Sequence, residues 1–264
     1  VGLGDEVVTV SHSFIATANS IRYCGAVPVF VDVEPGTYNL DPELIERVIS
    51  KKTKAIIPVH FAGKSCDMSA IQKLAKKNNL EIIEDCAHAI GTKFNKTHVG
   101  NFGKTGCFSF YPTKNLTTFE GGMIITNYKK IASKIRSMRN HGITKSLKER
   151  FSNGYPWDFD VSELGYKYNM TDIAASFGLE QLTHIDDWHK RRLEIVKMYN
   201  DGMSAIEGLI LPKHVSSDIH AWHLYVIRII PVMWKITRNE LIEKINEREI
   251  GTSVHYIPVH MHSY

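Results

Sequence analysis

The sequence has little cysteine, no long apolar run and no strong excess of either charge, and each shortage excludes a class of protein. Its 264 residues include 4 cysteines, which show no CxxC spacing and lie inside apolar runs. We therefore expect neither a disulfide framework nor a cysteine metal site, but reduced, buried thiols in a cytoplasmic protein. No apolar run reaches the ~18 to 20 residues that cross a bilayer, so no membrane segment is expected.

The net charge of +4 is mild, and its densest cluster is the basic run 190–192 inside a helical pattern. We interpret this run as a solvated helix face and expect no nucleic-acid partner. The histidines lack metal-ligand partners at suitable spacing, so no metal site is predicted. The first residues lack the basic and apolar regions of a signal peptide, and no Met precedes Val1, so we expect the natural protein to begin upstream.

Short apolar runs alternate with helical spacing through the first third of the chain, which predicts an α/β fold with a mostly parallel sheet flanked by helices. Strands are expected at residues 7–10, 27–31, 55–59 and 80–83, with helices at 16–24, 41–50 and 67–78. Asp41, followed by Pro42, and Asp67 are typical N-cap residues, because an aspartate can accept a hydrogen bond from the first free backbone N–H groups.

After residue 85 the pattern becomes less regular. Strands are expected at 107–111 and 123–126, a helix at 129–139, an irregular segment at 142–169, and a long helix or helix pair at 171–199. Further strands at 222–230 and 251–256 flank a helix at 238–247. We predict a large domain over residues 1–200 and a smaller C-terminal α/β domain over 201–264.

Three segments place polar groups where buried strands end, which is where open parallel sheets bind ligands. Asp85 suits a protonated ring nitrogen or a ribose hydroxyl, although a helix N-cap explains it equally well. Lys114 follows an aromatic strand that contains Ser109, and a lysine in a partly desolvated pocket can form a Schiff base. Most lysines after a strand simply face solvent. The glycines of Glu120–Gly122 allow close approach to a ligand or make a hairpin turn.

In this order the segments belong to a larger set of motifs that lies nearly from end to end. The motifs are Gly4–Val8, Phe14–Asn19, Pro28–Val33, Thr53–His60, Glu84–Asp85, Ser109–Leu116, Glu120–Gly122, Arg139–Gly142 and Met170–Asp172. With them the chain resembles the DegT/DnrJ/EryC1/StrS family. These are sugar aminotransferases among the fold-type I enzymes of pyridoxal 5′-phosphate (PLP), in the aspartate aminotransferase superfamily.

The resemblance implies roles for five residues. Lys114 would form the Schiff base with PLP and then move a proton between the sugar carbon and the cofactor. Asp85 would pair with the pyridine nitrogen, so that the ring can accept electrons. His88 would lie near the phenolic oxygen, Ser109 would bind the phosphate, and Phe14 would stack on the ring, although Phe14 alone would be assigned to the core. A lysine at position 114 also argues against the family's dehydratase branch.

The chain departs from the family at three places. Lys167 stands where many members have an asparagine that reaches the phosphate in the partner subunit, so Lys167 is expected to replace it as a charged donor. An exposed loop lysine is the alternative. The family's Gly-Thr or Gly-Ser helix start lies upstream of Val1, and the family continues beyond residue 256, so both domains are expected to be incomplete. His255, in a segment that borders the substrate cleft, is a candidate substrate contact.

The resemblance implies a homodimer with shared active sites and a ping-pong reaction. An amino acid, glutamate in our expectation, would aminate the cofactor, which would pass the amine to a keto-sugar on a nucleotide. We considered two alternatives. A dehydrogenase would need a G-x-G-x-x-G turn that opens a helix, and none is found. A catalytically silent regulatory or scaffold protein on the same fold would keep the sheet but bind no cofactor.

Overall fold

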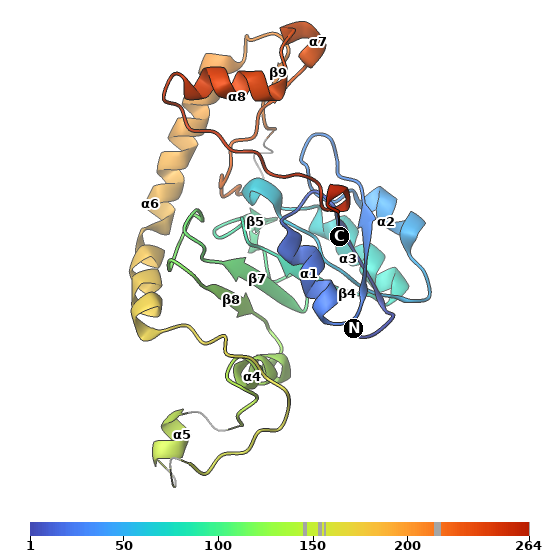
Figure 1. Ribbon diagram of the computed structural model, residues 1–264, viewed down its shortest axis with the longest axis vertical. Helices are drawn as coiled ribbons and strands as arrows, with labels where there is room; N and C mark the ends of the chain where they lie inside the picture. Colours follow the sequence, from blue (N-terminus) through green and yellow to red (C-terminus); the bar gives the residue numbers. More distant parts are fainter. Residues whose placement is uncertain (145–146, 153–154, 156, 214–217, 264) are drawn as a thin grey trace.

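The computed structural model describes residues 1–144, 147–152, 155, 157–213 and 218–263, with a six-stranded sheet at its centre (Figure 1). The sheet order is β2-β1-β3-β4-β7-β8, formed by β1 (Glu6–Val10), β2 (Val27–Val31), β3 (Thr53–Ile56), β4 (Glu81–Asp85), β7 (Thr105–Ser109) and β8 (Gly122–Ile125). Strands β1, β2, β3, β4 and β7 run parallel, and β8 pairs antiparallel with β7. The predicted α/β fold with a mostly parallel sheet is confirmed.

Helices cover both faces of the sheet: α1 (Ile15–Tyr23) packs on one, and α2 (Pro42–Val48) and α3 (Met68–Asn78) pack on the other. Side chains of a strand alternate between faces, so Val8 lies in the cluster with Ile45 of α2 and Ile71 of α3. The neighbouring Val7 instead packs with Ile21 of α1. A strand buried on both faces reads as a continuous apolar run, which is why β1 was predictable.

The two predicted helix starts are confirmed. The Asp41 side chain accepts a hydrogen bond from the Glu43 N–H at 2.9 Å, and the Asp67 side chain accepts from the Ala70 N–H at 3.0 Å. Each cap of this kind stabilises a helix by about 1 kcal/mol. Helix α3 then ends at Asn79, whose φ of 54° turns the chain out of the helix.

The remaining elements lie outside the main sheet. They are the hairpin β5 (Lys93–Phe94) and β6 (Thr97–His98), helices α4 (Lys129–Met138), α5 (Leu147–Ser152), α6 (Asp172–Met203), α7 (Pro231–Trp234) and α8 (Arg238–Asn246), the paired strands β9 (Leu209–Ile210) and β10 (Arg228–Ile229), and two 3-10 turns, η1 (Phe61–Gly63) and η2 (Val259–Met261). Figure 1 shows α6 running along one side of the molecule, from the region of α4 and α5 to that of α7 and α8. None of the described helices has both the length and the apolarity of a membrane span.

Several predictions about single elements need correction. The expected strand at 222–230 is reduced to β10, since among the described residues only Arg228 and Ile229 pair with a neighbouring strand, β9. Trp222, with a φ of 48°, is itself outside the extended region. The expected strand at 251–256 does not form, since none of the described strands pairs with it. Cys24 is exposed rather than buried, while all four cysteines are free thiols as expected. The segment 171–199 belongs to one helix, α6, which crosses the predicted domain boundary; the division at residue 200 stays a prediction.

Candidate active site

The carboxyl ends of the parallel strands meet at one edge of the sheet. From β1 the sheet extends in one direction to β2 and in the other through β3, β4 and β7. Ligands of open α/β sheets bind outside the carboxyl ends of the parallel strands. Asp85 is the last residue of β4, and Ser109 is the last residue of the adjacent β7, whose following turn contains Lys114. The structure therefore places these three predicted residues at neighbouring strand ends.

Asp85 is half-buried, and both of its oxygens accept hydrogen bonds. The Thr17 hydroxyl donates to Oδ2 at 2.8 Å, and the Ala87 N–H donates to Oδ1 at 3.1 Å. Thr17 is itself within 2.7 Å of the Ser13 hydroxyl, so the contact extends into the loop before α1. A turn rather than a helix follows β4, so the alternative interpretation of Asp85 as a helix N-cap is wrong. The carboxylate is fixed in direction and keeps lone pairs for a cationic ligand group.

Lys114 is half-buried in the turn after β7, where its backbone N–H donates to the Tyr111 carbonyl at 2.9 Å. Burial lowers the pKa of its ammonium group, and the charge of Asp85 opposes that shift. A lowered pKa increases the fraction of neutral amine, which is the form that attacks a carbonyl group. The position and the environment of Lys114 therefore suit a nucleophilic amine with a carboxylate nearby.

Ser109 and Phe14 complete the predicted surroundings of these groups. The Ser109 hydroxyl oxygen accepts a hydrogen bond from the Tyr111 N–H at 3.4 Å. Phe14 is the N-cap residue of α1, and 58% of its surface is exposed. Its ring centroid lies 6.0 Å from that of Tyr256, a residue far along the chain. An exposed aromatic ring at a strand end can stack on a planar ligand.

Histidines gather around Lys114, and the sequence predicted only some of them. His88 is 7% exposed, and its ring centroid lies 4.4 Å from that of His223 and 6.1 Å from that of His255. Burial, followed by the charges of His223, Lys114, His255 and His12, lowers the pKa of His88 to about 2. Burial and the charge of Lys114 lower the pKa of His223 to about 3. Both of these rings are therefore neutral at pH 7. His12 lies just after the end of β1, and Asp85 lies at the end of β4. The position of His12 after a predicted strand could therefore have identified it as a site residue.

A buried carboxylate next to Asp85 was not predicted. Glu84 is 0% exposed. It accepts hydrogen bonds from the His60 ring at 3.1 Å and from the N–H groups of Gly100, Phe102 and Gly103 at 2.6, 2.7 and 2.8 Å. Burial opposes ionisation, but these hydrogen bonds outweigh it and lower the pKa of Glu84. Its spacing from Ile82 within an apolar strand was the available signal, because residues two apart share a face.

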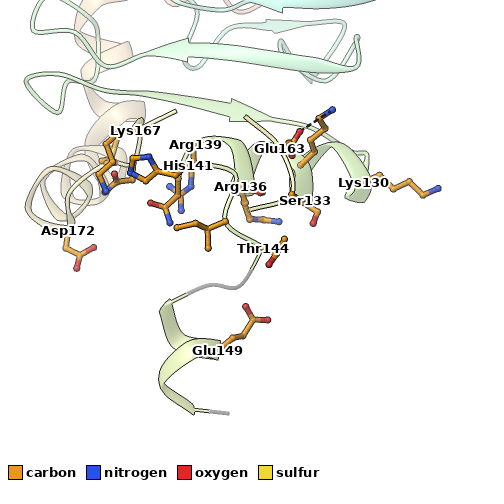
Figure 2. A pocket seen from close by; sticks show the side chains of 17 residues that line it. Lys130, Ser133, Arg136, Arg139, His141, Thr144, Glu149, Glu163, Lys167 and Asp172 are labelled. Carbon is orange, nitrogen blue, oxygen red and sulfur yellow. Dashed lines mark ion pairs between the residues drawn. The ribbon is translucent and has the colours of Figure 1, made fainter. Parts of the chain in front are cut away.

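Lys167 lines a cavity of about 1390 Å³, and neither Asp85 nor Lys114 is among the residues that line it. Its backbone forms an antiparallel bridge with Asn140. Figure 2 shows Lys167 beside Arg139 and His141, close to the start of α6. The structure thus separates Lys167 from the other predicted cofactor residues of the same chain.

The sequence profile of the DegT/DnrJ/EryC1/StrS aminotransferase family matches residues 1–264. The chain is 48% identical over 263 residues to an uncharacterised protein of Methanocaldococcus jannaschii, with 98% of this chain and 67% of that protein covered. It is 45% identical over 265 residues to the spore coat polysaccharide biosynthesis protein SpsC of Bacillus subtilis, with 100% of this chain and 68% of SpsC covered.

Two solved structures share the fold. The PLP-form of Spr1654 from Streptococcus pneumoniae matches with a TM-score of 0.89 at 30% identity, covering 100% of this chain and 70% of its own. DesI, solved in the presence of its TDP-sugar product, matches with a TM-score of 0.87 at 26% identity, covering 99% of this chain and 64% of DesI. Because the profile match runs from the first residue to the last, this chain belongs to the DegT/DnrJ/EryC1/StrS aminotransferase family, a family of PLP-dependent enzymes.

Proposed function

We propose that this chain forms the cofactor-binding part of an aminotransferase that transfers an amino group to a keto-sugar linked to a nucleotide. The proposed amino donor is an amino acid, in our proposal glutamate. One observation carries the proposal: Asp85 ends β4, and Lys114, with its lowered pKa, lies in the turn that follows the adjacent parallel strand β7. Transamination needs these two groups at one ligand, an amine for the carbonyl carbon and an anion for the ring nitrogen.

The polar lining of the site fits a bound cofactor. His12 Nδ1 and His223 Nε2 are buried and have no hydrogen-bond partner among the residues that the structure describes. Buried polar atoms are nearly always paired, so these nitrogens favour a polar ligand in the space around Lys114. PLP, when bound, supplies an aldehyde that condenses with amines and a ring that accepts electrons.

Each of the predicted site residues would then have its own role. Asp85, held by Thr17, would keep the ring nitrogen protonated. The Lys114 amine would hold the cofactor and then take and return the proton at the reacting carbon. The Ser109 hydroxyl would donate to the phosphate, and the exposed ring of Phe14 would stack on the pyridine. His255, whose pKa is lowered by burial and then by Lys114, would contact the substrate.

The substrate proposal rests on the relatives. DesI was solved in the presence of a TDP-sugar product, and SpsC is a polysaccharide biosynthesis protein. A nucleotide-linked keto-sugar is the acceptor that suits both descriptions. We further propose a homodimer in which Lys167 reaches the cofactor phosphate of the partner subunit, which agrees with its position in a cavity that neither Asp85 nor Lys114 lines.

Visible absorbance of the purified chain mixed with PLP tests the proposal. A band at about 410 to 430 nm is expected in the parent, trapped by borohydride, because a protonated Schiff base absorbs there. Lys114→Ala should lose the band, whereas Lys104→Ala, a surface lysine near β7, should keep it. A band that survives in Lys114→Ala would contradict the role of Lys114. No band in any variant would favour a catalytically silent scaffold.

A further inference from the structure

The hydrogen bonds of His88 determine which of its ring nitrogens carries hydrogen. Nδ1 lies 3.3 Å from the backbone nitrogen of Ala62, whose N–H can only donate. Nδ1 must therefore accept, and the hydrogen of the neutral ring must be on Nε2. The pKa of about 2 agrees, since it keeps the ring uncharged at pH 7. His88 is thus a single tautomer with one hydrogen to donate.

That hydrogen is already used. His88 Nε2 lies 3.1 Å from the hydroxyl oxygen of Tyr256, so Nε2–H donates and the tyrosine oxygen accepts. The hydrogen of the Tyr256 hydroxyl must then point to a different acceptor. Within the described part of the chain, the hydroxyl makes no second hydrogen bond. Tyr256 therefore has a donor to offer to a ligand, whereas His88 has none.

The Tyr256 side chain lies inside the candidate site. Its ring centroid is 6.0 Å from that of Phe14 and 6.5 Å from that of Phe61. Burial and the charge of Asp85 raise its pKa to about 12, so the hydroxyl keeps its hydrogen at neutral pH. Asp85 is the charged group that acts on this hydroxyl, and His88 is its hydrogen-bond partner. Around His88 in turn lie His223, Lys114, His255 and His12.

We propose that Tyr256 is a further cofactor-binding residue, whose hydroxyl donates to the phenolic oxygen of bound PLP, and that His88 is the positioning residue that orients it. This inference rests on the proposed function. PLP carries that oxygen on the ring carbon next to its aldehyde, so a ring bound to Lys114 brings the oxygen to the same part of the site. The oxygen is an anion and needs a donor. His88 could supply one only by giving up its bond to Tyr256.

The proposal predicts a change in the pKa of the Schiff base between Lys114 and PLP, which is followed by the visible absorbance band. A donor to the phenolic oxygen reduces the negative charge that holds the Schiff-base proton, so the donor lowers the pKa of that proton. Tyr256→Phe should therefore raise the pKa of the Schiff-base nitrogen by about one unit, which is a tenfold change in its proton affinity. A pH titration of the absorbance measures it.

Two comparisons separate this role from a structural one. Tyr38→Phe is a matched control, because Tyr38 packs 6.0 Å from the same Phe61 ring but makes no hydrogen bond to His88; its band should titrate like that of the parent. His88→Gln can still accept from Ala62 and donate to Tyr256, so its titration should also stay close to the parent. His88→Leu cannot, and should shift the band in the direction of Tyr256→Phe.

A measurement without cofactor checks the tautomer directly. Nitrogen NMR of the histidine rings should show hydrogen on Nε2 of His88 in the parent. Hydrogen on Nδ1 would overturn the inference at its first step. An unshifted band in Tyr256→Phe, beside a normal band in the parent, would overturn the inference and leave the proposed function intact. A parent without any band would overturn both.

Discussion

Glu84 and Asp85 are consecutive residues of β4, and their side chains point to opposite faces of the sheet. Asp85 faces the ligand edge, while Glu84 is fully buried and binds His60 and the loop 100–103. A buried carboxylate is costly unless its oxygens are well paired, and here both are. Glu84 therefore fixes the strand end from which Asp85 projects. Replacing one carboxylate oxygen of Glu84 tests this role.

Glu84→Gln is expected to lower the free energy of unfolding by about 3 kcal/mol, because an amide NH₂ cannot accept the bonds that a carboxylate oxygen accepts. Urea unfolding at pH 7 measures this change. Glu81→Gln is the matched control on the same strand, since Glu81 is exposed and only 3.5 Å from Lys104 in a surface pair. It should change stability by less than about 1 kcal/mol. Equal effects in the two variants would show that burial of Glu84 is unimportant.

The same variant should remove part of the pH dependence of stability. The folded-state pKa of Glu84 lies below its ordinary value of 4.5, so the unfolded state gains a proton first as the pH falls. The stability that Glu84 contributes is thus present above that value and is lost as the pH falls through the folded pKa. The difference in stability between parent and Glu84→Gln should shrink steadily over this range.

At the scale of elements, β7 depends on its close approach to the preceding loop. A Cβ atom on Gly106 would lie 2.2 Å from the Cα atom and 2.9 Å from the carbonyl oxygen of Gly100. Gly106→Ala must therefore move backbone, and we expect a loss of about 3 kcal/mol of stability by thermal unfolding. A Cβ on Gly251 would meet nothing within 4 Å, so Gly251→Ala should be nearly neutral. A neutral Gly106→Ala would mean that β7 can shift freely.

Elements with strong local signals were predictable, and elements that depend on partners were not. The Asp67 cap predicted α3 to within one residue at its start, because the cap acts on its own backbone. The segment 251–256 has strand-like residues, but none of the strands in the described part of the chain pairs with it, and no local signal in the sequence reveals that. The residues of the site divide in the same way, into those with a local sequence signal and those that depend on distant partners. Asp85 and Lys114 were found from strand ends, whereas the contact of His88 with Tyr256 joins residues 168 apart in sequence.

At the scale of the whole molecule, α6 leaves most of its large apolar side chains exposed. Of its 32 residues only Val196 is buried. Exposed along it are Ile173, Phe177, Leu179, Leu182, Trp188, Leu193, Met198 and Tyr199. Phe177 stacks with the exposed Phe119 at 5.1 Å, which extends this apolar surface toward β8. An apolar surface of this extent is typical of a protein interface, and it supports the proposed homodimer.

An active site that is built from residues of both subunits makes a testable prediction about mixed dimers. In a dimer, Lys114 of one subunit would hold the PLP whose phosphate contacts Lys167 of the partner subunit. Lys114→Ala dimers should form no visible band, and Lys167→Ala dimers should bind PLP several-fold more weakly than the parent. A mixed dimer contains one site with both native lysines, because each subunit supplies the residue that the other lacks.

Unfolding the two variants together and refolding them should therefore restore a fraction of sites with parental PLP affinity, measured by titration of the visible band. Refolding each variant alone is the control and should restore none. Sedimentation of the same samples reports whether dimers form. If mixed dimers form but all remaining sites bind PLP as weakly as Lys167→Ala, then Lys167 acts within its own subunit. If Lys167→Ala alone binds PLP with parental affinity, then Lys167 has no role at the phosphate. Restored high-affinity sites would place Lys114 and Lys167 on opposite sides of one subunit interface, as the proposed shared site requires.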